Sequence, residues 1–248
     1  MKNVISVRNE KMKREAGPPP IARTGNEDPI YLNQIKALGA KFEYKIDMLK
    51  IKVVAVTSAI AGEGKTTTCV QLASQLVMAG RKKVLLIDAD MRKSDLARGM
   101  NVSRLPGLSE FLNGRVALND ILQNSFLPGL YIIAAGRRVE EGAELLAGER
   151  FRTFLGEIRS HFDIILLDSP PILPVADTLS LRDQVDGFLF LYRAGLTPHP
   201  MLRQAVEEIG EEKILGVVLN GVKPQPQKYY QRYYGKYYHK PSVGETND

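Results

Sequence analysis

The sequence has one cysteine, three histidines and no tryptophan in 248 residues. Because Cys69 stands alone, an internal disulfide and a multi-cysteine metal cluster are excluded, and a reducing compartment is indicated. His161, His199 and His239 lack the spacing of metal ligands. No apolar run approaches the ~18 residues of a membrane span, and the N-terminus lacks the apolar region of a secretory signal peptide. These absences predict a cytoplasmic protein.

Charge is unevenly placed along the chain, which carries a net +6. Residues 1–50 hold 10 basic and 6 acidic side chains, residues 51–221 hold 19 and 20, and residues 222–248 hold 5 and 2. A nearly neutral body lacks the basic face of a duplex-binding protein, so we expect no nucleic-acid partner. The basic ends are either solvated termini or a match for an anionic membrane surface or an acidic partner.

Short apolar segments alternate with amphipathic ones from Lys52 onward. Segments such as Ile164–Leu167 are apolar throughout, as expected for strands that are covered on both faces. This alternation predicts an α/β fold with a mostly parallel sheet and helices on both faces. The predicted strands are Val53–Thr57, Val84–Asp88, Tyr131–Ala134, Asp163–Asp168, Gly187–Tyr192 and Leu215–Leu219, and the predicted helices are Thr66–Met78, Glu149–His161 and Met201–Ile209.

Changes in composition divide the chain into three parts. Residues 1–29 are a basic flexible segment that ends in the Pro- and Gly-rich linker Ala16–Pro29. Residues 30–222 hold the nucleotide-binding domain, led by a helix over Ile30–Ile46 that Gly39 is expected to interrupt. Residues 223–248 form a tail without a core pattern.

A phosphate-binding loop is predicted at Ala59-Ile-Ala-Gly-Glu-Gly-Lys65-Thr66, between the first strand and a helix. Glycines let backbone N–H groups close around phosphates at a helix N-terminus, the lysine reaches the outer phosphates, and the Thr hydroxyl ligates Mg²⁺. The strict pattern has glycine where Ala59 stands. The residues assigned to the nucleotide are Ala61, Gly62, Glu63, Gly64, Lys65, Thr66 and Thr67.

Two further strands end in carboxylates. Asp88 ends the strand Val84–Asp88 and Asp90 comes two residues later, so both side chains lie on the same side if the strand pleat continues that far. Asp168 ends the apolar run Ile164–Leu167 in the manner of a Walker B strand, whose carboxylate holds the Mg²⁺ shell. Ligands of open α/β sheets bind at the carboxyl ends of the strands. Three such elements in this order predict a P-loop NTPase-like site for ATP or GTP.

These motifs together resemble those of the bacterial protein-tyrosine kinases of capsular and exopolysaccharide export. Leu85-Leu-Ile-Asp88-Ala-Asp90-Met-Arg92 is similar to their Walker A′ motif, and Leu166-Leu-Asp168-Ser-Pro-Pro171 to their Walker B. The resemblance covers roughly residues 45–222 and the tail. It implies ATP and Mg²⁺ as cofactors, with Thr66, Asp90 and Asp168 as metal ligands, Lys65 and Asp88 as catalytic residues, and Asn220 near the adenine. From sequence alone the roles of Asp88 and Asp90 can be exchanged.

The tail carries six of the ten tyrosines of the chain, in pairs four residues apart. Members of the family autophosphorylate such clusters, so the resemblance implies these residues as phosphate acceptors. A tyrosine stripe on a packed helix is the structural alternative, and Gly235, Pro226 and Pro241 count against it. Phosphorylation of all six would convert a segment of net +3 into one of roughly −6 to −9. The acceptors are Tyr229, Tyr230, Tyr233, Tyr234, Tyr237 and Tyr238.

Partners and rival functions also follow from the resemblance. It implies a membrane adaptor of the polysaccharide co-polymerase type, which would hold the kinase at the inner face of the membrane, tail phosphorylation between copies, and a cognate tyrosine phosphatase. Family members often carry a ring-assembly Glu-x-x-Arg-x-x-Arg helix, but Tyr31, Gln34 and Ala37 occupy these positions here. Two alternatives stay open: a nucleotide-binding regulator without kinase activity, and a ParA/MinD-type ATPase, which would carry lysine where Ile60 stands.

Overall fold

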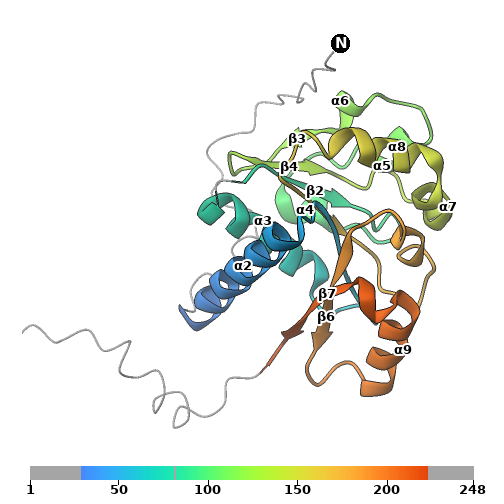
Figure 1. Ribbon diagram of the computed structural model, residues 1–248. Coiled ribbons are helices and arrows are strands. Elements are labelled where there is room, and N and C mark those ends of the chain that lie inside the picture. The colour runs from blue at the N-terminus through green and yellow to red at the C-terminus, as the bar shows by residue number, and fades with distance from the viewer. Residues whose placement is uncertain (1–28, 81, 223–248) are drawn as a thin grey trace, which may run out of the picture.

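The computed structural model describes residues 29–80 and 82–222. Its centre is a seven-stranded sheet with the strand order β3-β4-β2-β5-β1-β6-β7 (Figure 1). All neighbouring strands run parallel except β3 and β4, which pair antiparallel. The strands are β1 Val53–Ser58, β2 Val84–Asp88, β3 Gln123–Asn124, β4 Leu130–Ile133, β5 Ile164–Asp168, β6 Gly187–Arg193 and β7 Ile214–Asn220. The predicted mostly parallel α/β fold is confirmed.

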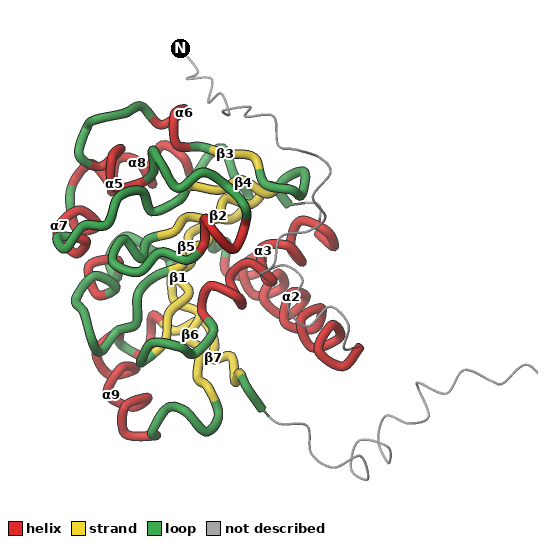
Figure 2. The backbone as a smooth tube through the Cα atoms, turned by 180° about the vertical axis from the view of Figure 1, so that it is seen from behind, coloured by secondary structure: helices red, strands yellow, loops and turns green. Residues whose placement is uncertain are grey.

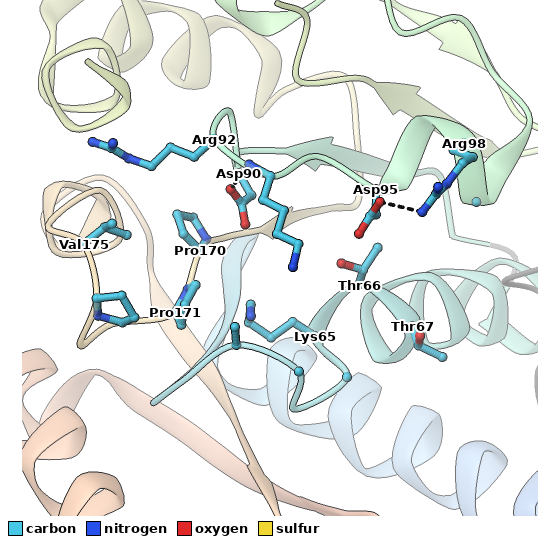
Figure 3. Close-up of a pocket in the computed structure, with 16 residues that line it drawn as sticks. Lys65, Thr66, Thr67, Asp90, Arg92, Asp95, Arg98, Pro170, Pro171 and Val175 are labelled. Carbon is cyan, nitrogen blue, oxygen red and sulfur yellow. Dashed lines mark hydrogen bonds and ion pairs between the residues drawn. The ribbon is translucent and has the colours of Figure 1, made fainter. Parts of the chain in front are cut away.

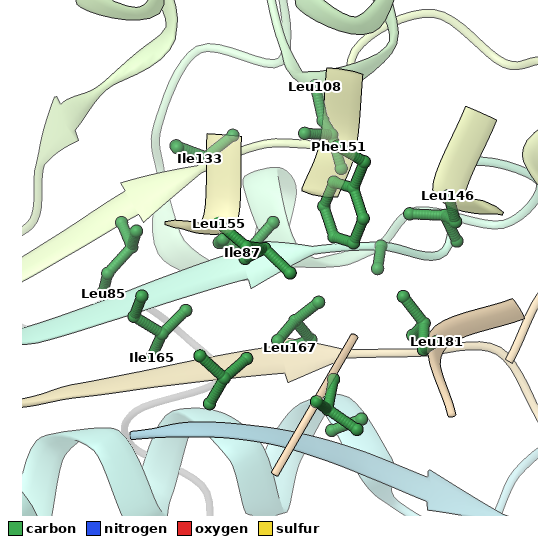
Figure 4. Packing of buried hydrophobic residues seen from close by; sticks show 14 of the residues in the cluster. Leu85, Ile87, Leu108, Ile133, Leu146, Phe151, Leu155, Ile165, Leu167 and Leu181 are labelled. Carbon is green, nitrogen blue, oxygen red and sulfur yellow. The ribbon is translucent and has the colours of Figure 1, made fainter. Parts of the chain in front are cut away.

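The central strands are apolar throughout because both of their faces are buried. Along β1, Val53 and Ala55 belong to one hydrophobic cluster, whereas Val54 and Val56 belong to the cluster on the opposite face. Successive side chains of a strand point to opposite faces of the sheet. Here both faces are buried, so each strand contributes to two hydrophobic clusters, and neither face is left to solvent. Figure 4 shows part of the first cluster, in which Leu85 of β2 and Ile165 of β5 lie near Leu155.

Helices cover the sheet on both sides. The helices α2 Pro29–Leu49 and α3 Lys65–Gly80 contribute to one cluster, and α8 Glu149–Ile158 and α9 His199–Ile209 to the other. Figure 2 shows α2 and α3 side by side on one side of the sheet. The remaining elements are α4 Leu96–Met100, α5 Leu108–Leu112, α6 Leu118–Ile121, α7 Gly142–Ala147 and the 3₁₀ turns η1 Leu179–Leu181 and η2 Glu211–Lys213.

The leading helix differs from its prediction, because α2 runs through Gly39 without a break. A Cβ atom built on Gly39 would lie 3.0 Å from the Cβ of Gln75 on α3, so the glycine allows the two helices to approach closely. The buried positions of α2 are Ile35, Gly39, Phe42 and Ile46, spaced as one helical face. This glycine therefore serves helix packing and does not end the helix.

The other predicted elements agree with the structure within a few residues at their ends. The two-residue strand β3 and the short helices α4 to α7 were not predicted, because segments of four to six residues carry too little periodicity. Most of the predicted linker and all of the predicted tail lie outside the described residues. Among the helices of residues 29–80 and 82–222, none has the length and apolar content that crossing a membrane requires.

Candidate nucleotide site

The phosphate loop lies between β1 and α3, as the sequence predicts. Gly62 and Gly64 have φ angles of 83° and 95°, a region that residues with side chains rarely adopt, so the loop conformation requires glycine at both positions. A cavity of about 770 Å³ opens above the loop (Figure 3). It is lined by Ala61, Gly62, Gly64, Lys65, Thr66, Thr67, Asp90, Arg92, Lys93, Asp95, Arg98, Gly99, Pro170, Pro171, Pro174 and Val175.

Lys65 and Thr66 begin α3 at the floor of this cavity. Burial lowers the pKa of Lys65, while the charges of Asp168, Asp90 and Glu63 oppose this change. The N-terminal end of a helix adds unpaired N–H groups that favour an anion. A buried ammonium group and a helix N-terminus at one place form a binding site for phosphate groups.

Asp168, at the end of β5, has the properties of a metal ligand. Burial raises its pKa to about 7, although the Thr66 hydroxyl and the Lys65 charge oppose the shift. Its buried Oδ1 atom has no hydrogen-bond partner within the part of the chain that the structure describes. An unpaired buried carboxylate oxygen beside a threonine hydroxyl and a phosphate site is a donor set that fits Mg²⁺.

No three His, Cys, Asp or Glu side chains within residues 29–80 and 82–222 gather closely enough to hold a metal by themselves. This agrees with Mg²⁺, which is commonly bound by one or two carboxylates together with water and substrate phosphates. Asp90 lines the cavity above the loop, so its carboxylate is available there beside Thr66.

β2 ends at Asp88, so the strand pleat on which a shared side for Asp88 and Asp90 depended does not continue to Asp90. Asp88 is fully buried, and its carboxyl oxygens accept hydrogen bonds from Asp90 N at 3.2 Å and Ser94 Oγ at 2.6 Å. Burial and the Asp168 charge raise the pKa of Asp88 well above its usual value. Of the two aspartates, only Asp90 is among the residues that line the cavity.

Two residues assigned to the nucleotide direct their side chains elsewhere. Glu63 is fully buried, is absent from the cavity lining, and bonds through its carboxylate to the end of β6. Asn220 ends β7 and donates from Nδ2 to the backbone oxygen of Glu63 at 2.7 Å. The Glu63 side chain thus points from the loop into the protein, and Asn220 contacts the loop backbone. The predicted contact of Asn220 with adenine stays a prediction.

Sequence reasoning assigned no role to Arg92, which lines the cavity, or to its partner Asp177. Arg92 donates through Nε to Asp177 Oδ2 at 3.0 Å and through Nη1 to Glu140 Oε2 at 2.8 Å. The Asp177 side chain is fully buried, so this ion pair fixes the Arg92 loop to the segment after β5. Arg92 stood inside a recognised motif, whereas Asp177 carried no signal in the sequence.

The P-loop NTPase-like fold and this cavity imply nucleotide binding. Comparisons with known proteins then show to which family of nucleotide-binding proteins the chain belongs. A family model described as an AAA domain matches residues 51–184. The tyrosine-protein kinase CpsD of Streptococcus agalactiae serotype III (strain NEM316) is 34% identical over 181 residues, which cover 72% of this chain and 78% of the relative. The chain belongs to the bacterial protein-tyrosine kinase family.

A solved structure supports this membership. The kinase domain of the Escherichia coli tyrosine kinase ETK is similar with a TM-score of 0.78 and 27% identity, covering 88% of this chain and 86% of that one. Some relatives are much longer. The chain spans only 29% of the tyrosine-protein kinase ptk of Acinetobacter johnsonii, with 26% identity over 85% of this chain. The six candidate acceptor tyrosines of this family member lie outside the described residues.

Proposed function

We propose that this chain is an ATP-dependent protein-tyrosine autokinase that phosphorylates the tyrosines of its own C-terminal tail and thereby regulates exopolysaccharide or capsule polymerisation and export. The observation that carries the proposal is that Lys65, Thr66 and Asp90 line one cavity above the phosphate loop, and that the buried Asp168 carboxylate is hydrogen-bonded to Thr66 and lies near the Lys65 charge. Membership in a family whose relatives are named tyrosine-protein kinases supports the choice of reaction.

In this proposal Lys65 and the N–H groups of the loop hold the phosphates of ATP. Thr66, Asp90 and Asp168 hold Mg²⁺, which neutralises charge on the phosphates when it is bound. Phosphoryl transfer depends mainly on positioning and charge neutralisation, so few groups need to act covalently. The cavity residues Lys93 and Arg98 add positive charge near the phosphates.

The acceptor hydroxyl needs a group that takes its proton within hydrogen-bond reach. Asp90 lines the cavity, whereas Asp88 lies behind it with both oxygens engaged. This geometry favours giving the catalytic role to Asp90 in place of Asp88, in addition to its role toward the metal. We propose that Asp90 faces the tyrosine hydroxyl and the metal, and that Asp88 orients the turn that carries Asp90.

The tail has the reach that the reaction needs. The 16 residues from Lys223 to Tyr238 span up to ~50 Å when extended, compared with a radius of gyration near ~18 Å for a globule of this length. The same length permits phosphorylation of a neighbouring copy. We further propose activation by a membrane adaptor of the polysaccharide co-polymerase type, which would place the kinase at the membrane, and reversal by a tyrosine phosphatase.

Incubation of the purified chain with Mg·ATP, followed by intact mass measurement, tests the proposal. Wild type should gain phosphate-mass additions, and the Lys65→Met variant should gain none. If both bind ATP and neither gains phosphate even with a candidate adaptor segment present, the regulator without kinase activity is the better description. A chain that hydrolyses ATP without modifying itself would instead favour the ParA/MinD-type reading.

A further inference from the structure

Glu63 lies inside the phosphate loop, yet its side chain points into the protein. The side chain is fully buried, and its carboxylate accepts three hydrogen bonds. Ile60 N donates to Oε2 at 2.9 Å, and Arg193 N donates to Oε1 at 3.0 Å. The hydroxyl of Thr197, in the connection between β6 and α9, donates to Oε1 at 2.5 Å. One carboxylate thus joins the loop to the end of a strand 130 residues away in the chain.

A buried carboxylate is costly unless its oxygens are fully hydrogen-bonded, and bonds to a charged acceptor are about twice as strong as neutral ones. Among the described residues, Glu63 has no ion-pair partner within 4.0 Å, so these three donors hold the carboxylate. A surface-loop residue without a specific task would be expected in water instead. The arrangement indicates that the carboxylate fixes the loop.

Two further contacts hold the backbone of the loop from the same side. Arg193 Nη1 donates to the carbonyl oxygen of Gly62 at 2.8 Å, and Asn220 Nδ2 donates to the carbonyl oxygen of Glu63 at 2.7 Å. In a trans peptide group the N–H points opposite to the C=O. Fixing these two carbonyls toward β6 and β7 therefore turns the N–H groups of Glu63 and Gly64 away from those strands.

We propose that Glu63 is a positioning residue that attaches the phosphate loop to the ends of β6 and β7 and so holds its N–H groups ready for the nucleotide phosphates. Glu63 itself does not touch the phosphates through its side chain. This inference rests on the proposed nucleotide site. It adds that the affinity for nucleotide is set in part by two strands that contribute no residue to the cavity lining.

The Glu63→Gln variant tests the inference because its shape is nearly unchanged. The amide has one acceptor oxygen and places its NH₂ group against a backbone N–H donor, either of Ile60 or of Arg193. Loss of hydrogen bonds to a charged group predicts a Kd for Mg·ADP and Mg·ATP raised by about ten-fold or more. The rate at saturating ATP should stay within about three-fold, since the residues that touch the phosphates remain.

The matched control is Glu157→Gln, an exposed glutamate on α8, which should leave the Kd at the wild-type value. A folded Glu63→Gln protein with the wild-type Kd would overturn the inference. If Glu63→Gln does not fold, the Kd of the Thr197→Val variant is measured instead, because this substitution removes one of the three hydrogen bonds to the Glu63 carboxylate. A Kd raised by about three-fold supports the inference, and an unchanged Kd overturns it. A wild-type chain that binds no nucleotide would contradict the proposed function itself.

Discussion

Asp88 and Asp168 end neighbouring parallel strands as register partners, and both carboxyl groups are buried. Burial raises the pKa of each, and the Asp168 charge raises the pKa of Asp88 further. Two buried carboxyl groups in such proximity do not both ionise readily unless a cation is near. Lys65 supplies one positive charge, and a divalent ion at Asp168 would supply more. A cation bound at Asp168 would therefore reduce the repulsion between the two carboxyl groups.

The first prediction concerns stability against pH. The folded pKa of Asp168 is about 7, above its ordinary value of 3.8. A group with a raised folded pKa stabilises the protein fully below the unfolded pKa, and this stability is lost as the pH rises through the folded pKa. Without Mg²⁺, the free energy of unfolding should fall between about pH 5 and about pH 8, and Asp168→Asn should reduce that fall.

Asp186 supplies the control for this experiment. Its pKa is lowered by hydrogen bonds from Arg159 and from the backbone of Lys52 and Val53, which outweigh the effect of burial. A lowered folded pKa gives stability above the unfolded pKa that is lost only as the pH falls through the folded value. Asp186→Asn should therefore lower stability by the same amount at both pH values. Equal pH slopes for wild type and Asp168→Asn in urea unfolding would contradict the first prediction.

The second prediction separates the two aspartates after β2. Asp90→Asn removes a carboxylate from the cavity and should lower the rate of phosphate incorporation by about 100-fold or more. Asp88→Asn removes a buried acid that touches no cavity space, so its effect on the rate should be smaller. Initial rates by intact mass measurement, at saturating ATP, compare the two variants. A larger loss in Asp88→Asn than in Asp90→Asn would return the catalytic role to Asp88.

The third prediction concerns the ion pair between Arg92 and Asp177. Arg92→Ala would leave the Asp177 carboxylate fully buried without its cation, and Arg92→Lys lacks the fork that makes both bonds. Removing the partner of a buried carboxylate leaves that charge unpaired, so either variant should lower the free energy of unfolding. Arg152→Ala breaks an exposed pair and should cost under about 0.5 kcal/mol. Urea unfolding of the three variants measures these changes in the free energy of unfolding. Equal losses at the two sites would show that the Arg92–Asp177 pair does not stabilise the loop that lines the cavity.

The fourth prediction tests the docking of α2 on α3. Phe42 is 5% exposed within the cluster on that face of the sheet, whereas Tyr44 is 69% exposed. Phe42→Ala should lower the free energy of unfolding by about 3–5 kcal/mol, and Tyr44→Ala by under about 0.5 kcal/mol. If Phe42→Ala were as mild as Tyr44→Ala, the helix would not be part of the folded unit.

The fold and the site could be predicted from the sequence where a residue type has only one structural explanation at its position. Apolar strands such as β5 must be buried on both faces, and the phosphate loop needs glycine at Gly62 and Gly64. Gly39 misled the prediction because the same residue type serves close helix packing. The partners of Asp177 and Glu63 lie 85 and 130 residues away in the chain, so only the folded structure brings them together.

The most direct test of the central claim is to locate the phosphate. The wild-type chain and a variant with all six tail tyrosines replaced by phenylalanine are incubated with Mg·ATP, and the peptides of the whole chain are sequenced by mass spectrometry. We predict phosphotyrosine within Tyr229–Tyr238 of wild type and no phosphate on the variant. Phosphate found at equal levels in both proteins, or in wild type only outside the tail, would contradict the account.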